Sequence, residues 1–168
     1  GITRIVNNNF DIICNSKAIK NLLMGHFPIE HNSIKVINNG INIQKKKVNS
    51  YNSSHYIVMF VGNLREVKNP IFFLRVAKEI IENKVFSISF HMIGSGPLLS
   101  QIKNYITINN LGNRIRVYGK VAFGNVPYSN IDLVFNCSLS EGSSNAILEA
   151  LSFGKPVVAS DNAGNNEI

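Results

Sequence analysis

The stretch DLVFNCSLSEGSSNAILEALSFGKPVVAS, residues 132–160, predicts a strand, a helix and a second strand. Its two ends, 132–137 and 156–160, are short apolar runs typical of buried strands. Between them, residues 145–153 carry apolar side chains at helical spacing. Small polar residues precede this helix, so its first backbone N–H groups, which have no partner inside the helix, stay uncovered. We therefore expect a helix start that attracts anions.

Two glutamates frame that helix start. Glu141 comes just before it, and Glu149 falls on the helix, up to about 12 Å further along. Two glutamates could simply face solvent. The apolar residues on both sides of Glu149 favour instead a buried carboxylate, which needs partners such as sugar hydroxyls. A carboxylate on each side of an anion site suits a nucleotide-sugar, whose hydroxyls flank a pyrophosphate.

Outward from this stretch, strand-like and helix-like segments alternate along the chain. We expect strands at 11–14, 34–37, 55–61, 86–93, 114–118, 132–137 and 156–160. We expect helices at 17–24, capped by Asn15 and Ser16 and ended by Gly25, and at 70–83, 98–110 and 145–153. This order predicts an α/β fold with a Rossmann-like, doubly wound parallel sheet, which binds its ligand beyond the carboxyl ends of the strands.

The composition places the chain among soluble globular proteins. It has 168 residues, of which 45% are apolar and 16% charged, and it lacks an apolar run of the roughly 20 residues that span a bilayer. It starts without Met or a signal-peptide pattern, and no helix is expected after the last strand, so we expect a piece of a larger protein. The polar segment 44–54 is the best candidate for a linker.

The net charge of +7 does not by itself indicate a partner. Lys45, Lys46 and Lys47 fall in a polar stretch that favours a solvated loop, and the other basic residues lack the aromatic interleaving of a nucleic-acid groove. A basic surface would suit an anionic donor or an anionic membrane face. Cys14 and Cys137 show no metal or redox spacing, so we expect buried, reduced thiols.

The loops after the expected strands are rich in glycine and small polar residues. Gly62 permits a tight turn, and Arg65 and Lys68 offer cations close to the next helix start. On its own this loop is equally compatible with an ordinary strand–helix connection. The segment 94–97, Gly-Ser-Gly-Pro, is like the beginning of a dinucleotide fingerprint, but the third glycine and the acidic residue are missing, so a plain turn is favoured.

Taken together, these segments resemble the retaining glycosyltransferases of family 4, the glycogen-synthase-like group with the GT-B fold. The motifs that carry the resemblance follow the family's order and cover nearly the whole chain. They are VINNGI at 36–41, VG at 61–62 with KNP at 68–70, IGSGPL at 93–98, VYGKV at 117–121, EGSSN with EA at 141–150, and GKPVVASD at 154–161.

The resemblance implies a division of the chain into two parts. In this family two Rossmann-like domains enclose a cleft, and the C-terminal one binds the nucleotide-sugar donor. Residues 1–43 would then form the end of the preceding, N-terminal acceptor domain and the crossing between the domains, and residues 44–168 most of the donor domain. We expect this chain alone to be inactive, because most of the acceptor domain would be missing.

The resemblance also implies roles for individual residues. Glu141 would hold sugar hydroxyls close to the anomeric carbon, and Lys68 would stabilise the departing diphosphate, which makes these two the catalytic candidates. Glu149 would bind the ribose diol, and Val121 would contact the base through its backbone. The other donor-binding candidates are Gly62, Asn63, Arg65, Gly94, Gly142, Ser143, Ser144, Asn145 and Ala146.

Asn63 departs from the family's pattern, which usually has an arginine directly after the glycine that ends this strand. We hypothesise that Arg65 supplies the missing cation, because it is the nearest one in the same loop. Only three aspartates occur, and none of them forms an Asp-x-Asp pair. We therefore expect no divalent-metal site. The resemblance implies no cofactor, with the nucleotide-sugar as a substrate.

The resemblance implies a hexosyltransferase that moves a sugar from a nucleotide-diphosphate sugar, most simply a UDP-sugar, to a hydroxyl acceptor with retained anomeric configuration. It implies cell-envelope polysaccharide or lipopolysaccharide synthesis in the cytoplasm, at the inner face of the membrane, with a glycan or lipid-linked acceptor and no nucleic acid. Two alternatives stay open, a GT-B-like nucleotide-sugar epimerase and a non-catalytic nucleotide-binding module. A module would be expected to lose Lys68 or Glu141, and both are present.

Overall fold

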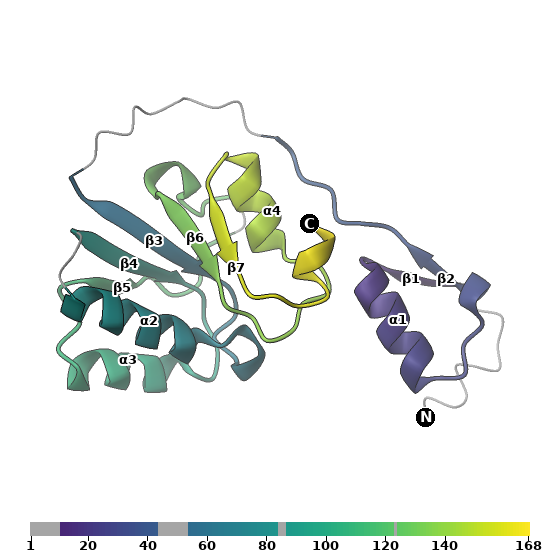
Figure 1. Ribbon diagram of the computed structural model, residues 1–168, viewed down its shortest axis with the longest axis horizontal. Helices are drawn as coiled ribbons and strands as arrows, with labels where there is room; N and C mark the ends of the chain where they lie inside the picture. The colour runs from purple at the N-terminus through teal and green to yellow at the C-terminus, as the bar shows by residue number, and fades with distance from the viewer. Residues whose placement is uncertain (1–10, 44–53, 84–86, 123) are drawn as a thin grey trace.

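The computed structural model describes residues 11–43, 54–83, 87–122 and 124–168, which form a larger and a smaller lobe (Figure 1). The larger lobe contains a five-stranded sheet. Its strands are β3 (Tyr56–Val61), β4 (Ile88–Ile93), β5 (Ile115–Val117), β6 (Leu133–Asn136) and β7 (Val157–Ala159). They pair in the order β5-β4-β3-β6-β7, and every pair is parallel. The predicted doubly wound α/β fold is confirmed.

The strand order identifies the place where a ligand is expected. The first strand of this sheet along the chain, β3, lies in its middle. The chain then adds β4 and β5 on one side and crosses to β6 and β7 on the other. The loops after β3 and β6 therefore leave neighbouring strands in opposite directions and open a crevice between them. Open α/β sheets bind ligands in such a crevice.

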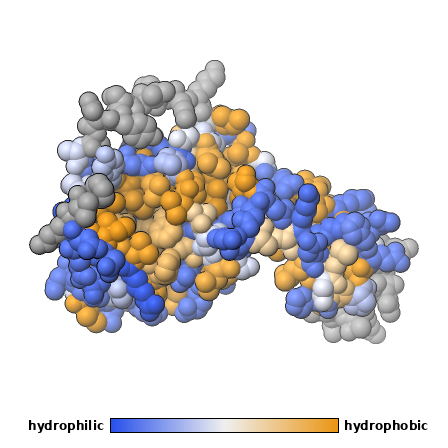
Figure 2. Space-filling model, viewed as in Figure 1, coloured by the Kyte–Doolittle hydropathy of each residue, from blue (hydrophilic) through white to orange (hydrophobic). Residues whose placement is uncertain are grey.

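Helices cover both faces of this sheet. The helices α2 (Pro70–Asn83) and α3 (Leu99–Ile108) lie on one face, and α4 (Asn145–Ser152) lies on the other (Figure 1). Because successive strand residues point to opposite faces, Val58 and Phe60 of β3 pack into the apolar cluster under α2 and α3, whereas Met59 packs into the cluster under α4. Apolar residues gather over the middle of the larger lobe (Figure 2).

The smaller lobe contains β1 (Ile12–Cys14), α1 (Lys17–His26) and β2 (Ile34–Val36), with the two strands paired in parallel. Ser16 caps α1 as predicted, since its hydroxyl accepts a hydrogen bond from the backbone N–H of Ile19 at 3.2 Å. The prediction that Gly25 ends this helix is wrong. The helix continues to His26 and ends at Phe27, which is extended because a proline follows it.

Other predictions have mixed outcomes. Cys14 and Cys137 are buried and free, as expected. None of the helices in the described part of the chain has the length and apolar character needed to cross a bilayer. The predicted linker at 44–54 falls almost entirely outside the described residues, and the division at residue 43 stays a prediction.

Candidate functional site

Lys68 and Glu141 meet at the crevice between β3 and β6. Lys68 ends the 3₁₀ turn η3 (Glu66–Lys68) that follows β3, and Glu141 lies in the loop that follows β6. The Lys68 ammonium is 2.5 Å from Oε1 and 2.6 Å from Oε2 of Glu141. The side chains are 26% and 6% exposed, respectively, so the carboxylate is buried and the ammonium keeps access to solvent. The two catalytic candidates are thus direct partners of one another.

Two further side chains hold the Glu141 carboxylate. The Ser138 hydroxyl donates to Oε1 at 2.7 Å, and the Asn136 amide approaches the same oxygen at 3.5 Å. Lysine has three donor N–H groups and a carboxylate has about four acceptor positions. Among the residues that the structure describes, these bonds therefore leave one free donor on Lys68 and one free position on Oε2. Asn136 and Ser138 were not predicted as site residues, although both are polar residues at the end of an apolar strand.

The start of α4 is uncovered. Ser144 is its N-cap residue, but the Ser144 hydroxyl accepts from the Asn136 amide at 3.0 Å and not from a helix N–H. In the described part of the chain, none of the backbone N–H groups of residues 142–146 has a hydrogen-bond acceptor. The first turn of α4 also contains no acidic residue. An unpaired run of N–H groups at a helix start is the geometry that binds phosphate oxygens.

Close backbone contacts fix the loops around this helix start. A Cβ atom on Gly142 would lie 2.9 Å from Cγ1 of Ile19 on α1, and one on Gly164 would lie 2.1 Å from the carbonyl oxygen of Glu141. The Glu141 loop is therefore held between α1 and the C-terminal segment. The Asn145 side chain also reaches the smaller lobe, because its Oδ1 accepts from the amide of Asn39 at 2.7 Å.

The remaining loop candidates lie at the carboxyl ends of β3 and β4. The N–H of Gly94 donates to the carbonyl of Gly119 at 2.7 Å, and a Cβ on Gly94 would lie 1.8 Å from the carbonyl oxygen of Gly62. A larger residue would push these loops apart. Asn63 and Arg65 are exposed in the loop after β3, and the Arg65 side chain has no partner among the described residues. Its role in charge compensation stays a prediction.

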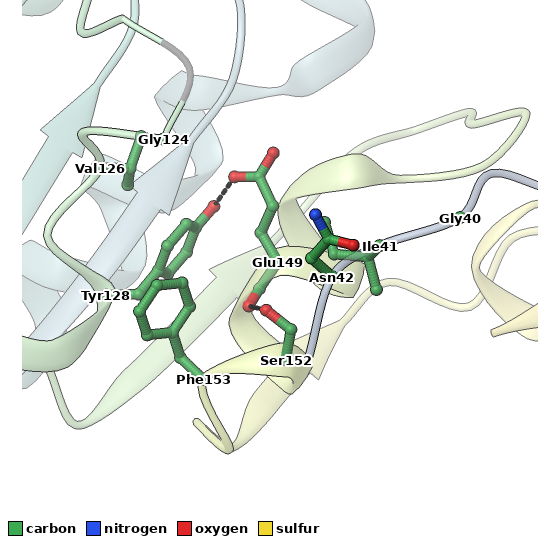
Figure 3. Close-up of a pocket in the computed structure, with 9 residues that line it drawn as sticks. All are labelled: Gly40, Ile41, Asn42, Gly124, Val126, Tyr128, Glu149, Ser152 and Phe153. Atoms are coloured by element: carbon green, nitrogen blue, oxygen red, sulfur yellow. Dashed lines mark hydrogen bonds between the residues drawn. The ribbon is translucent and has the colours of Figure 1, made fainter. Parts of the chain in front are cut away.

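Glu149 lies apart from the Lys68 pair, on the border of a cavity of about 490 Å³ (Figure 3). Its Oε2 accepts a hydrogen bond from the Tyr128 hydroxyl at 2.8 Å, and the Tyr128 ring stacks on Phe153 with centroids 5.5 Å apart. Burial and the Glu149 carboxylate raise the pKa of Tyr128 well above its usual value, so the phenol stays a donor. Val121 packs against the same apolar cluster. Glu149 is only partly buried at the border of this cavity, so the prediction of a buried carboxylate is not met.

A second helix start near the site is closed by the protein itself. The Glu167 carboxylate accepts from the backbone N–H groups of Lys17 at 2.8 Å and Ala18 at 2.5 Å, at the beginning of α1. Glu167 ends the 3₁₀ turn η5 (Asn165–Glu167), so this contact joins the C-terminal segment to the smaller lobe. Glu167 was not predicted, because its partners lie 150 and 149 residues away along the chain.

Comparison with known proteins identifies the family. Residues 55–168 match the family described as glycosyl transferases group 1. The chain is 32% identical to the UDP-Gal:alpha-D-GlcNAc-diphosphoundecaprenol alpha-1,3-galactosyltransferase of Escherichia coli, over 92% of this chain and 43% of that protein. It is also 32% identical to an uncharacterized glycosyltransferase of Methanocaldococcus jannaschii, over 96% of this chain and 43% of that protein. The chain belongs to the group 1 glycosyltransferases and spans less than half the length of these relatives.

Solved structures agree on the fold. The chain superposes on TarM of S. aureus, solved in complex with UDP among other molecules, with a TM-score of 0.80 and 22% identity over 95% of this chain and 31% of that one. It superposes on HepE of Anabaena, in complex with UDP and glucose, with a TM-score of 0.80 and 22% identity over 94% of this chain and 46% of that one. At this identity the likeness concerns the Rossmann-like fold.

Proposed function

We propose that this chain supplies the donor-binding part of a retaining family 4 glycosyltransferase, which moves a hexose from a UDP-sugar to a hydroxyl acceptor. The observation that carries the proposal is the run of unpaired backbone N–H groups at 142–146, next to the Lys68 ammonium. Together they offer positive charge and fixed donors at one point, as a diphosphate requires. The UDP bound in two structures of the same fold supports this choice of donor.

The free hydrogen-bonding positions support the catalytic roles that we propose. When the bond between the anomeric carbon and the diphosphate oxygen breaks, negative charge accumulates on the diphosphate. The remaining N–H of Lys68 and the amides of 142–146 stabilise this charge. The free position on Oε2 of Glu141 accepts a hydroxyl of the transferred sugar. Arg65 adds a cation on the side of the β3 loop, and the reaction needs no metal.

The rest of the donor extends along α4. Glu149 binds the ribose diol from the edge of the cavity, and the loop that contains Val121 contacts the base through its backbone. The donor site uses residues 44–168, and residues 11–43 contribute the crossing segment, of which Gly40, Ile41 and Asn42 line the same cavity. The acceptor binds mainly through residues outside this chain.

The names of two relatives support a lipid-linked acceptor. The E. coli relative is named for a diphosphoundecaprenol acceptor, and a Campylobacter jejuni relative, 27% identical over 58% of this chain, is an N-acetyl-D-galactosaminyltransferase named for an acceptor that ends in PP-undecaprenol. A glycan built on such a carrier belongs to cell-envelope synthesis. We place the enzyme in the cytoplasm, at the inner face of the membrane that holds the carrier.

Product analysis of the complete protein tests the proposal. The protein is incubated with UDP-, GDP- and ADP-sugars, an undecaprenyl-diphosphate sugar and EDTA, and the product is examined by NMR. We expect sugar transfer from a UDP-sugar. A donor with an α-linked sugar should give a product with an α-linkage, and EDTA should not change the rate of transfer. An epimerised nucleotide-sugar, a β-linkage, or binding without turnover would overturn it. Arg65→Ala should weaken donor binding, whereas an unchanged affinity would remove Arg65 from the site.

A further inference from the structure

The hydrogen bond from Tyr128 to Glu149 joins two different elements at the border of the cavity. Tyr128 is 2% exposed, and its ring is held by Phe153, while its hydroxyl meets a carboxylate on a different element. The 3₁₀ turn η4 (Tyr128–Asn130) fixes its backbone, since the N–H of Tyr128 donates to the carbonyl of Val126 at 2.8 Å. Tyr128 is therefore a rigid donor aimed at a flexible acceptor.

The Glu149 carboxylate divides its two oxygens between the protein and the cavity. Oε2 accepts from Tyr128, and Oε1 has no partner in the described part of the chain. Figure 3 shows the carboxylate between the loop that contains Gly124 and the segment of Ile41, with its second oxygen turned away from Tyr128. A free glutamate side chain samples several rotamers, and fixing them costs free energy on binding. The tyrosine removes this cost in advance.

We propose that Tyr128 is a positioning residue that sets the selectivity of the donor site for a ribose diol by holding Glu149. This inference rests on the proposed function, because it takes the ligand of Glu149 to be the ribose of the donor. With Oε2 held, Oε1 accepts a diol hydroxyl in a fixed geometry. A deoxyribose lacks one of the hydroxyls that Oε1 would accept and binds more weakly.

The test compares ribo- and deoxyribonucleotides on the complete protein. Affinities are measured by calorimetry for the tightest binder among UDP, GDP and ADP, and for its 2′-deoxy and 3′-deoxy forms. The parental protein should prefer the ribonucleotide, and Tyr128→Phe should reduce this preference roughly tenfold, the size expected for one hydrogen bond to a charged group. In turnover, the donor KM should rise while kcat changes little, because Tyr128 touches no reacting atom.

Further variants separate positioning from folding. Tyr128→Phe keeps the stacked ring, and Glu149→Asp keeps the charge but withdraws the carboxylate from the hydroxyl, so both should reduce the preference. The double variant Tyr128→Phe, Glu149→Gln should have the same ribonucleotide preference as Glu149→Gln alone, because Tyr128 acts only through the Glu149 carboxylate. Tyr105→Phe, on α3 at the opposite face of the sheet, is the matched control and should retain parental selectivity.

The outcomes distinguish this inference from the function on which it rests. If the parental protein binds none of the nucleotides, the proposed function fails. If it binds and prefers the ribonucleotide, but Tyr128→Phe retains that preference or weakens all nucleotides equally, only the role of Tyr128 fails. A parental protein that binds ribo- and deoxyribonucleotides equally would overturn both the ribose role of Glu149 and the positioning by Tyr128.

Discussion

The helices α1 and α4 begin close to the same crevice, yet their first turns are treated in opposite ways. At α1, the Ser16 hydroxyl and the Glu167 carboxylate together occupy the N–H groups of residues 17–19. At α4, the Ser144 hydroxyl bonds to Asn136, and the backbone N–H groups of residues 142–146 have no partner among the described residues. The protein supplies its own anion at one helix start and leaves the other open.

This difference distinguishes a structural helix end from a ligand site. An uncapped helix start is less stable than a capped one by about 1 kcal/mol. The chain has suitable side chains around α4, but it directs Ser144 and Asn136 toward each other and Glu141 toward Lys68. The open amides and the cation beside them together attract an anion from outside. At α1 the Glu167 carboxylate provides the negative charge that the helix start attracts.

Removing the cation beside the open helix start should have the largest effect. In Lys68→Met, kcat for sugar transfer should fall at least 100-fold, because the diphosphate loses charge stabilisation during bond breaking. Stability should also fall, by about 1–3 kcal/mol, because the buried Glu141 carboxylate loses its partner. Steady-state kinetics and urea unfolding of the complete protein measure the two effects.

Two controls keep these effects apart. Lys68→Met combined with Glu141→Gln leaves no unpaired buried charge, so stability should recover while activity stays low. Lys78→Met removes the lysine of an exposed pair with Glu82 on α2 and should change neither quantity noticeably. Full activity in a folded Lys68→Met protein would show that α4 needs no cation to hold the donor.

Adding a carboxylate to the start of α4 should give this helix an anion of the protein's own, as Glu167 does at α1. Asn145→Asp keeps an oxygen for the amide of Asn39 and adds a carboxylate to the first turn. Stability should rise by about 0.3–1 kcal/mol, because the charge complements the helix dipole. The affinity for UDP should drop about tenfold through charge repulsion, and less at high salt. Calorimetry and thermal unfolding, run at two salt concentrations, check both directions.

The matched control for this charge change is an asparagine on a different helix, α3. Asn104→Asp introduces the same carboxylate at an exposed position of α3, on the opposite face of the sheet, and should leave UDP affinity within about twofold. An Asn145→Asp variant that binds UDP as tightly as the parental protein would contradict the placement of the diphosphate at α4.

The fold could be predicted from the sequence because its signals are local. Pro70 and the apolar spacing after it place α2 at 70–83, as observed. The small polar residues before 145 predict the open start of α4 for the same reason. The prediction that Gly25 ends α1 was wrong, because a glycine can end a helix but does not have to. Pro28 sets the end instead, since its ring sterically excludes the helical conformation at Phe27.

The partners within the site could not be predicted, because they depend on tertiary contacts. Lys68 and Glu141 are 73 residues apart, and each was predicted only as a ligand-facing residue. The bonds from Tyr128 to Glu149 and from the Lys17 amide to Glu167 could not be predicted, because these partners are 21 and 150 residues apart along the chain. The first two pairs meet through the packing of the larger lobe, and the third through the contact between the two lobes.

Opening the closed helix start should have the smallest effect, and it tests whether Glu167 acts only within the protein. Glu167→Gln keeps the shape of the side chain, but removes its charge and turns an amide N–H toward one of the donors at α1. Stability should fall by about 0.5–1 kcal/mol, and UDP affinity should stay within about twofold, because the amides of α4 are untouched. Glu82→Gln on α2 is the matched control with no expected loss. If Glu167→Gln weakened UDP binding as much as Asn145→Asp does, the two helix starts would not be independent, and the contact of Glu167 with α1 would have to be counted as part of the donor site.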